Sequence, residues 1–78
     1  MSGTDIEVEV DARGLLCPLP ILRLARAFRR LPSGAVARLL ATDPAAVPDV
    51  EAFCREKGHT LIGVDRDGGV LRFRVRKL

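Results

Sequence analysis

The stretch GLLCPLP, residues 14–20, joins a predicted strand before it to a predicted helix after it. Proline fits the first turn of a helix, because the backbone N–H groups there have no intrahelical partner and the fixed φ of proline is already nearly helical. Pro18 and Pro20 therefore predict that a helix begins here, with Cys17 at or beside its N-cap.

This position favours an ionised Cys17. Unpaired N–H groups and the positive end of the helix dipole stabilise an anion, and the thiolate is the nucleophilic form of sulfur. The two prolines weaken the effect by removing N–H donors. A nearby Arg13 would favour the thiolate, whereas Asp11 and Asp43 would oppose it if they came close. We interpret Cys17 as the candidate reactive group; the alternative is a small buried hydrophobic residue.

Length and composition predict one folded domain spanning residues 1–78. Hydrophobic residues make up 47% of the chain and charged residues 29%, which is typical of a folded protein. Residues 1–5 lack a signal-peptide pattern and no apolar run is long enough to cross a membrane, so we expect a cytoplasmic protein with no membrane partner. The chain has two cysteines, which do not form a CxxC pair, and a single histidine, His59. This composition predicts free thiols, no metal site and no cofactor.

Apolar periodicity predicts the order β-α-β-α-β-β. The alternation of Ile6, Val8 and Val10 with acidic residues predicts a strand over residues 5–11. Apolar residues at helical spacing predict a helix over 18–31. A second strand is expected at 35–41. A loose turn should follow it, because Pro48 lies four residues after Pro44, with a helix from about 48 to 57 and Gly58 after its end. A strand beginning at Leu61, a turn at 67–69 and a strand over 70–75 complete the chain.

These elements predict an α+β fold, a two-layer α/β sandwich with a mixed four-stranded sheet and both helices on one face. A right-handed crossover makes the first two strands parallel, so the loops that follow them emerge at the same end of the sheet. We therefore expect Cys17 to lie beside the turn at Asp43 and Pro44, at the end where ligand sites of parallel α/β units form. Asp43 is more simply a capping residue than a catalytic one.

The remaining polar and apolar candidates have simpler interpretations. Leu15, Leu16 and Leu19 are predicted mainly as core, although part of this cluster must border the thiol. Cys54 falls on the inward face of the second helix, and His59 is expected to be structural. The arginines of the last strand, at 72, 74 and 76, should face solvent or pair through Arg38 with the acidic first strand. A helical stripe is the better candidate for docking an acidic partner surface: Arg23, Arg26 and Arg30.

The sequence resembles the TusA-like (SirA-like) sulfur carrier family over essentially its whole length. The matching features are Asp11, Gly14-Leu15, Cys17-Pro18-Leu19-Pro20, Pro32-Ser33-Gly34, Thr42-Asp43-Pro44, Cys54, Gly58-His59 and Phe73-Arg74. The resemblance implies a β-α-β-α-β-β sandwich similar to the C-terminal domain of bacterial translation initiation factor three. The supporting residues of the candidate site are those of the motif and of the facing turn: Arg13, Gly14, Leu15, Pro18, Pro20, Asp43 and Pro44. Leu16, Leu19 and the arginine stripe are the candidate docking residues.

The resemblance also implies a function. Cys17 would accept a sulfane sulfur as a persulfide from a cysteine desulfurase or a rhodanese-type protein. It would then pass the sulfur to a thiol of an acceptor protein, toward tRNA thiolation, molybdenum cofactor or sulfur oxidation. Pyridoxal phosphate would belong to the desulfurase. The chain has no obvious general base, oxyanion-hole motif or cofactor loop, so we expect a sulfurtransferase that acts with partner proteins.

Two other classes of function remain as alternatives. A nucleic-acid-binding module would use the arginines of the open sheet face and would bind RNA with a steep salt dependence that survives loss of Cys17. We expect no direct nucleic-acid binding, because the three aromatic residues, all phenylalanine, fall on inward faces and offer no stacking platform. A regulatory interaction domain would keep its partner binding after Cys17→Ala.

Overall fold

The predicted order of elements is confirmed by a computed structural model, which describes residues 6–78. The first five residues, including Asp5 of the predicted strand pattern and the stretch considered for a signal peptide, lie outside the described residues. The elements are β1 (Val8–Ala12), α1 (Leu19–Phe28), β2 (Val36–Ala41), α2 (Ala46–Lys57), β3 (Thr60–Asp67) and β4 (Val70–Arg76).

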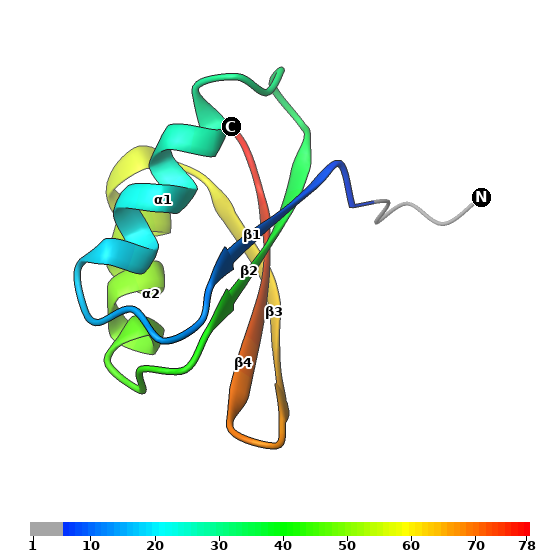
Figure 1. The fold of residues 1–78 in the computed structure, drawn as a ribbon. Coiled ribbons are helices and arrows are strands. Elements are labelled where there is room, and N and C mark those ends of the chain that lie inside the picture. The colour runs from blue at the N-terminus through cyan, green and yellow to red at the C-terminus, as the bar shows by residue number, and fades with distance from the viewer. Residues whose placement is uncertain (1–5) are drawn as a thin grey trace.

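The four strands form one mixed sheet with the order β1-β2-β4-β3. β1 and β2 are parallel, with Val10 opposite Leu39, and β4 runs antiparallel to both of its neighbours. Both helices lie on the same face of the sheet (Figure 1). The predicted two-layer α/β sandwich is therefore confirmed.

The core fills the space between the two helices and the sheet. Its largest fully buried side chains are Phe73, Leu24, Leu39, Val50, Val75 and Pro20. Cys54 belongs to this core, as predicted. His59 packs edge-on against Phe28, with ring centroids 4.7 Å apart, and its Nδ1 accepts a hydrogen bond of 3.0 Å from the N–H of Leu78. The prediction of a structural histidine is thus confirmed.

The first strand and the first helix have different bounds from those predicted. The alternating pattern runs over residues 5–11, whereas β1 covers Val8–Ala12, because its pairing with β2 joins Val8 to Ala37 and Ala12 to Ala41. α1 ends before residue 31. The N–H groups of Arg30 and Leu31 bond to carbonyls three residues back, which tightens the last turn into a 3₁₀ form.

The second helix begins at Ala46, two residues before the predicted start at Pro48. Pro48 is the third residue of α2, where the missing N–H would have had no intrahelical partner. The proline therefore does not delay the helix. Gly58 follows α2 with a φ of 78°, as predicted for a residue after the helix end.

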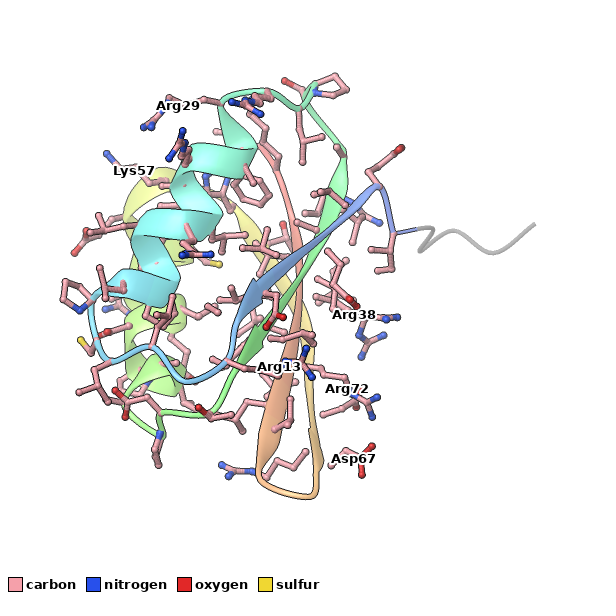
Figure 2. All side chains as sticks on the ribbon, in the orientation of Figure 1. Arg13, Arg29, Arg38, Lys57, Asp67 and Arg72 are labelled. Carbon is pink, nitrogen blue, oxygen red and sulfur yellow. The ribbon has the colours of Figure 1, made fainter. Side chains whose placement is uncertain are left out.

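The face of the sheet away from the helices carries charged side chains, including Arg38 and Arg72 (Figure 2). Arg38 of β2, which lies between β1 and β4 in the sheet, pairs with Glu9 of β1 at 3.2 Å. Arg72 contacts Asp67 beside the β3-β4 turn at 3.8 Å, not an acidic residue of β1. Among the helices formed by residues 6–78, none has the length and apolarity needed to cross a membrane.

Candidate functional site

Two loops meet at the carboxyl end of the parallel strands. The loop after β1 carries Gly14 and Cys17, and the loop after β2 carries Thr42 and Asp43. The Gly14 N–H donates to Thr42 Oγ1 at 2.9 Å, and the Cys17 N–H donates to Asp43 Oδ2 at 2.9 Å. These two bonds confirm that Cys17 and the Asp43-Pro44 turn are neighbours, and they fix the loop that carries the thiol.

Asp43 holds both loops with a single carboxylate. Its Oδ1 accepts the N–H of Ala45 at 3.0 Å, while its Oδ2 accepts the N–H of Cys17. These backbone hydrogen bonds hold the pKa of Asp43 below its usual value. Asp43 is therefore a capping carboxylate that stays charged. Pro44 is exposed in the same turn, and its carbonyl accepts the N–H of Val47 at 3.2 Å.

Cys17 lies one residue before the N-cap of α1, which is Pro18. The Cys17–Pro18 peptide bond is cis, and the Pro18 carbonyl accepts the N–H of Leu22 at 3.1 Å, the first helical bond. Pro20 is the second helical residue and is fully buried. The prolines mark the helix start as predicted, and they leave the Cys17 side chain exposed just outside it.

The predicted ionisation of the thiol is wrong for this arrangement. Cys17 Sγ donates a hydrogen bond to Asp49 Oδ2 at 2.5 Å. This bond, partial desolvation and the negative charges of Asp49 and Asp43 raise the pKa of the Cys17 thiol above its usual value. The two nearby carboxylates therefore raise the pKa of the thiol more than the start of α1 lowers it. The effect of the helix start is weak because Pro18 and Pro20 supply no N–H donors.

Arg13 is not the counter-ion of the thiol. Its guanidinium makes a bidentate pair with Asp11, at 2.9 Å from Nε to Oδ1 and 2.8 Å from Nη2 to Oδ2. The Arg13 N–H also donates to Asp11 Oδ1 at 3.1 Å. Together these bonds lower the pKa of Asp11 to about 2. The charges of Arg13 and Asp11, which precede Cys17 in the sequence, therefore compensate each other.

Asp49 is the functional residue that sequence reasoning missed. It lies in the first turn of α2, 32 residues from Cys17, and no local pattern connects the two. One signal was available, since the helix that follows the Asp43-Pro44 turn starts at the same end of the sheet as the thiol, and Asp49 lies in its first turn. A shallow pocket of about 230 Å³ beside the thiol includes Asp49, Ile21, Phe53 and Glu56 in its lining.

Exposed leucines precede and follow Cys17 at the start of α1. Leu15 packs against the core, as predicted, but Leu16 is 70% exposed and Leu19 is 46% exposed. Leu22, which the sequence analysis did not single out, is 57% exposed. Its spacing of three residues from Leu19 was the available signal, because it places both leucines on the helix side away from the core. We call Leu16, Leu19 and Leu22 the leucine rim.

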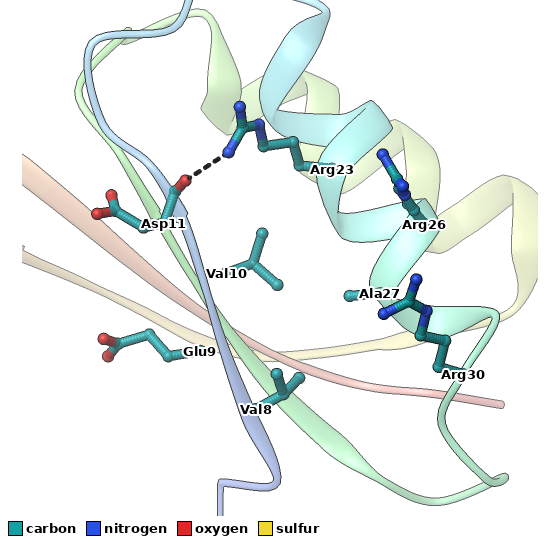
Figure 3. A pocket seen from close by; sticks show the side chains of 8 residues that line it. All are labelled: Val8, Glu9, Val10, Asp11, Arg23, Arg26, Ala27 and Arg30. Carbon is teal, nitrogen blue, oxygen red and sulfur yellow. Dashed lines mark hydrogen bonds between the residues drawn. The ribbon is translucent and has the colours of Figure 1, made fainter.

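The predicted arginine stripe extends away from the thiol along α1. Arg23, Arg26 and Arg30 line one side of a groove whose other side is β1 (Figure 3). Arg23 donates to the carbonyl of Asp11 at 3.5 Å. The stripe therefore lies beside the edge of the sheet rather than around Cys17.

Neither cysteine is in a disulfide, and within residues 6–78 no group of three or more His, Cys, Asp or Glu side chains is placed to hold a metal ion. The chemistry that the site offers is that of one exposed thiol. This thiol is hydrogen-bonded to a carboxylate, fixed by a second carboxylate through the backbone, and bordered by apolar surface.

Known proteins are similar to this chain in sequence and in fold. The family model described as Sulfurtransferase TusA matches residues 8–77. The sulfur carrier protein TusA of Allochromatium vinosum is 41% identical over 73 residues, which cover 94% of this chain and 96% of the relative. A putative sulfur carrier protein of Neisseria meningitidis is 45% identical over 67 residues, covering 86% and 90%.

A solved structure shows the same fold. The SirA-like protein of Desulfitobacterium hafniense superposes with a TM-score of 0.79 at 23% identity, covering 88% of this chain and 95% of the other. The family match spans both loops of the thiol site and all six elements of the sandwich. This chain, with its exposed Cys17 held between the two parallel-strand loops, therefore belongs to the TusA sulfurtransferase family.

Proposed function

We propose that this protein is a sulfur carrier in which Cys17 accepts a sulfane sulfur as a persulfide and passes it to a thiol of an acceptor protein. The observation that supports this most directly is the exposed Cys17 thiol on a loop fixed by Asp43 and Thr42, in a chain whose relatives are named sulfur carrier proteins. A carrier needs one accessible sulfur on a rigid support, because two partners must reach the same atom in turn.

The proposed transfer conserves atoms and electrons. Cys17 sulfur attacks the outer sulfur of the donor's Cys–S–S⁻ group, and the donor's S–S bond breaks as the new one forms. The donor leaves as a thiolate and takes up the proton that Cys17 releases, so that Cys17–S–S⁻ and a donor thiol result. An acceptor thiol then repeats the exchange and regenerates Cys17–SH. Its rate depends on the thiolate fraction and on access, as in thiol–disulfide exchange.

Asp49 is a positioning residue in this proposal. In the unloaded carrier it keeps the proton on Cys17 and orients Sγ through their hydrogen bond. A donor that brings a positive charge to Asp49 would relieve this effect and free the thiolate only within the complex. After loading, the same carboxylate repels the negative outer sulfur and favours its exposure to an acceptor.

The leucine rim and the arginine stripe are the proposed docking surfaces. Apolar side chains that are exposed beside the thiol would exclude water when a partner covers them. The donor is proposed to be a cysteine desulfurase, which carries its own pyridoxal phosphate, or a rhodanese-type protein. The transfer needs reduced thiols on all partners, which is the state of thiols in the cytoplasm, so we place the protein there. The acceptor would serve tRNA thiolation, molybdenum cofactor or sulfur oxidation.

Intact-protein mass spectrometry tests this proposal. The wild type, Cys17→Ala and the matched control Cys54→Ala are each incubated with a cysteine desulfurase and cysteine, and in parallel with a rhodanese and thiosulfate. We expect a gain of one sulfur atom that dithiothreitol removes, present in the wild type and in Cys54→Ala and absent from Cys17→Ala. A wild type that gains nothing from either donor, or a Cys17→Ala variant that is still loaded, would overturn the proposal.

A further inference from the structure

β1 is an edge strand with one unpaired side. It pairs only with β2 in the described sheet, which covers residues 6–78. The N–H of Lys77 donates to the carbonyl of Ala35 at 2.8 Å, so alternate residues of β2 from Ala35 turn their backbone groups toward β4, and the residues between them turn theirs toward β1. In the parallel register these groups meet the backbone of Val8 and Val10. This leaves the N–H and C=O groups of Glu9 and Asp11 on the open edge, where the Asp11 carbonyl accepts a hydrogen bond from Arg23. Such a row of backbone groups is a template for another strand.

A groove of about 430 Å³ runs along this open edge, between β1 and α1 (Figure 3). Val8, Val10 and Ala27 supply its apolar part. The arginine stripe forms the helix side of the groove, because Arg23, Arg26 and Arg30 follow each other at helical spacing. A segment that paired with β1 would therefore lie against apolar side chains and beneath three guanidinium groups.

The charged side chains that line the groove favour a ligand of one kind of charge. Arg23, Arg26 and Arg30 are all exposed, and none of them forms an ion pair with an acidic side chain of residues 6–78. Glu9 and Asp11 also line the groove at its β1 edge, and their side chains point away from α1 (Figure 3). Because side chains alternate along a strand, the favoured occupant is acidic on the side toward α1 and neutral or basic on the other side.

We propose that this groove binds an extended acidic segment of a partner protein, which adds to β1 as a fifth strand. Backbone hydrogen bonds to Glu9 and Asp11 would supply the register, and carboxylates meeting the arginine stripe would supply the selectivity. The segment would tether its protein along the helix that carries Cys17 at its start. The proposal goes beyond sulfur transfer, because it concerns a surface that needs no sulfur to be occupied.

The same charges disfavour two other occupants. A second copy of this chain, paired edge to edge through β1, would bring another arginine stripe toward the first, and like charges repel. RNA is negatively charged along its whole backbone, so it would meet Glu9 and Asp11 as well as the arginines. An extended peptide can alternate its side chains and thereby match both faces of β1.

The test is an NMR titration of the ¹⁵N-labelled full chain with synthetic peptides of about twelve residues, longer than a typical strand. In one peptide glutamates alternate with threonines, and in the other the same residues are arranged in two blocks. We expect the alternating peptide to bind more tightly and to slow amide exchange at Glu9 and Asp11, whose N–H groups face the open edge. Equal binding of the two peptides, or no protection at these amides, would overturn the proposal.

Two variants with the same change in net charge test the role of the arginine stripe. Arg26→Glu with Arg30→Glu should weaken binding of the alternating peptide by at least about tenfold. The matched control, Arg55→Glu with Arg66→Glu, changes exposed arginines of α2 and of β3, the other edge strand, and should leave binding unchanged. A larger loss in the control would place the peptide elsewhere and overturn the proposal.

Peptides methylated on alternate backbone nitrogens test strand addition without changing the protein. Only one of the two alternate sets of peptide N–H groups can face β1, so methylation of one set should abolish binding and methylation of the other should not. Equal effects of both sets would overturn the proposal.

Two other results would also overturn it. One is displacement of the peptide by oligouridylate at equal charge, and the other is dimerisation of the free chain through β1. The cysteine variants should bind the peptide like the wild type, so failure of this proposal is distinguishable from failure of sulfur transfer.

Discussion

The two cysteines of this chain lie in opposite environments, although the pKa of each thiol is raised. Cys54 is 5% exposed in the core, and burial alone raises its pKa. Cys17 is exposed, and a hydrogen bond to Asp49 is the largest cause of its raised pKa. A partner protein can neutralise or displace the carboxylate beside Cys17, whereas it cannot expose a thiol that is buried in the core. Ionisation of Cys17 is therefore restrained reversibly, and ionisation of Cys54 is restrained as long as the protein is folded.

The largest expected difference between the two thiols is in their rates of alkylation. We predict that iodoacetamide modifies native Cys17 at least about 100-fold faster than Cys54, because the reagent reaches Cys54 only when the core opens. Peptide mass mapping over a time course measures both rates in one sample. In denaturant the two rates should converge, and comparable rates in the native protein would contradict the comparison.

Removal of the Asp49 charge should make Cys17 more reactive. We predict that Asp49→Asn lowers the pKa of the Cys17 thiol and raises its alkylation rate near neutral pH by about threefold or more, because only the thiolate reacts. The measurement is a profile of rate against pH. Its midpoint should move to lower pH while the plateau at high pH stays the same.

The control for Asp49→Asn is Glu56→Gln. Glu56 lines the same shallow pocket as Cys17 but makes no hydrogen bond to the thiol among the contacts of residues 6–78. Its variant should keep the midpoint of the wild type. If Asp49→Asn also keeps that midpoint, the Asp49 hydrogen bond does not govern ionisation of Cys17.

Apolar periodicity was sufficient to predict the sandwich, because each element buries one face with a regular spacing. The alternation of Leu71, Phe73 and Val75 predicted the buried face of β4, and all three are buried. The bounds of α1 and α2 depended on backbone bonds that periodicity does not report. The start of α2 was missed because the rule that proline disturbs a helix does not hold in the first turn.

The site was predicted less completely, because its chemistry depends on contacts between distant residues. The position of Cys17 beside Asp43 followed from the parallel pairing of β1 and β2. The ionisation of Cys17 did not follow, since it required knowing which side chain of α2 turns toward the thiol. A local effect, the helix start, was predicted from the sequence, and the long-range effect of Asp49 proved larger.

A smaller effect should separate the two cysteines in stability. We predict that Cys54→Ser lowers the free energy of unfolding by about 1–2 kcal/mol, because it places a hydroxyl in an apolar core. Cys17→Ser should leave the urea midpoint unchanged, because the side chain is exposed. Cys54→Ala serves as the control for loss of sulfur without added polarity. A Cys17→Ser variant less stable than Cys54→Ser would reverse the assignment of structural and reactive thiols.

The smallest effect concerns how the loop of Cys17 responds to acid. Backbone hydrogen bonds lower the pKa of Asp43 from 3.8, so its stabilising contribution is present above the unfolded value and is lost as pH falls through the folded value. We predict that the amide proton shifts of Cys17 and Ala45 titrate together with a midpoint below 3.8, whereas that of Cys54 does not follow them. A pH titration by NMR measures all three amides in the same spectra.

The variant Asp43→Asn should abolish the shared titration step and should be less stable than the wild type at neutral pH. This stability deficit arises from the loss of a charge, so it should shrink toward pH 2. A deficit that stays constant would mean that Asp43 holds the loop by its shape alone.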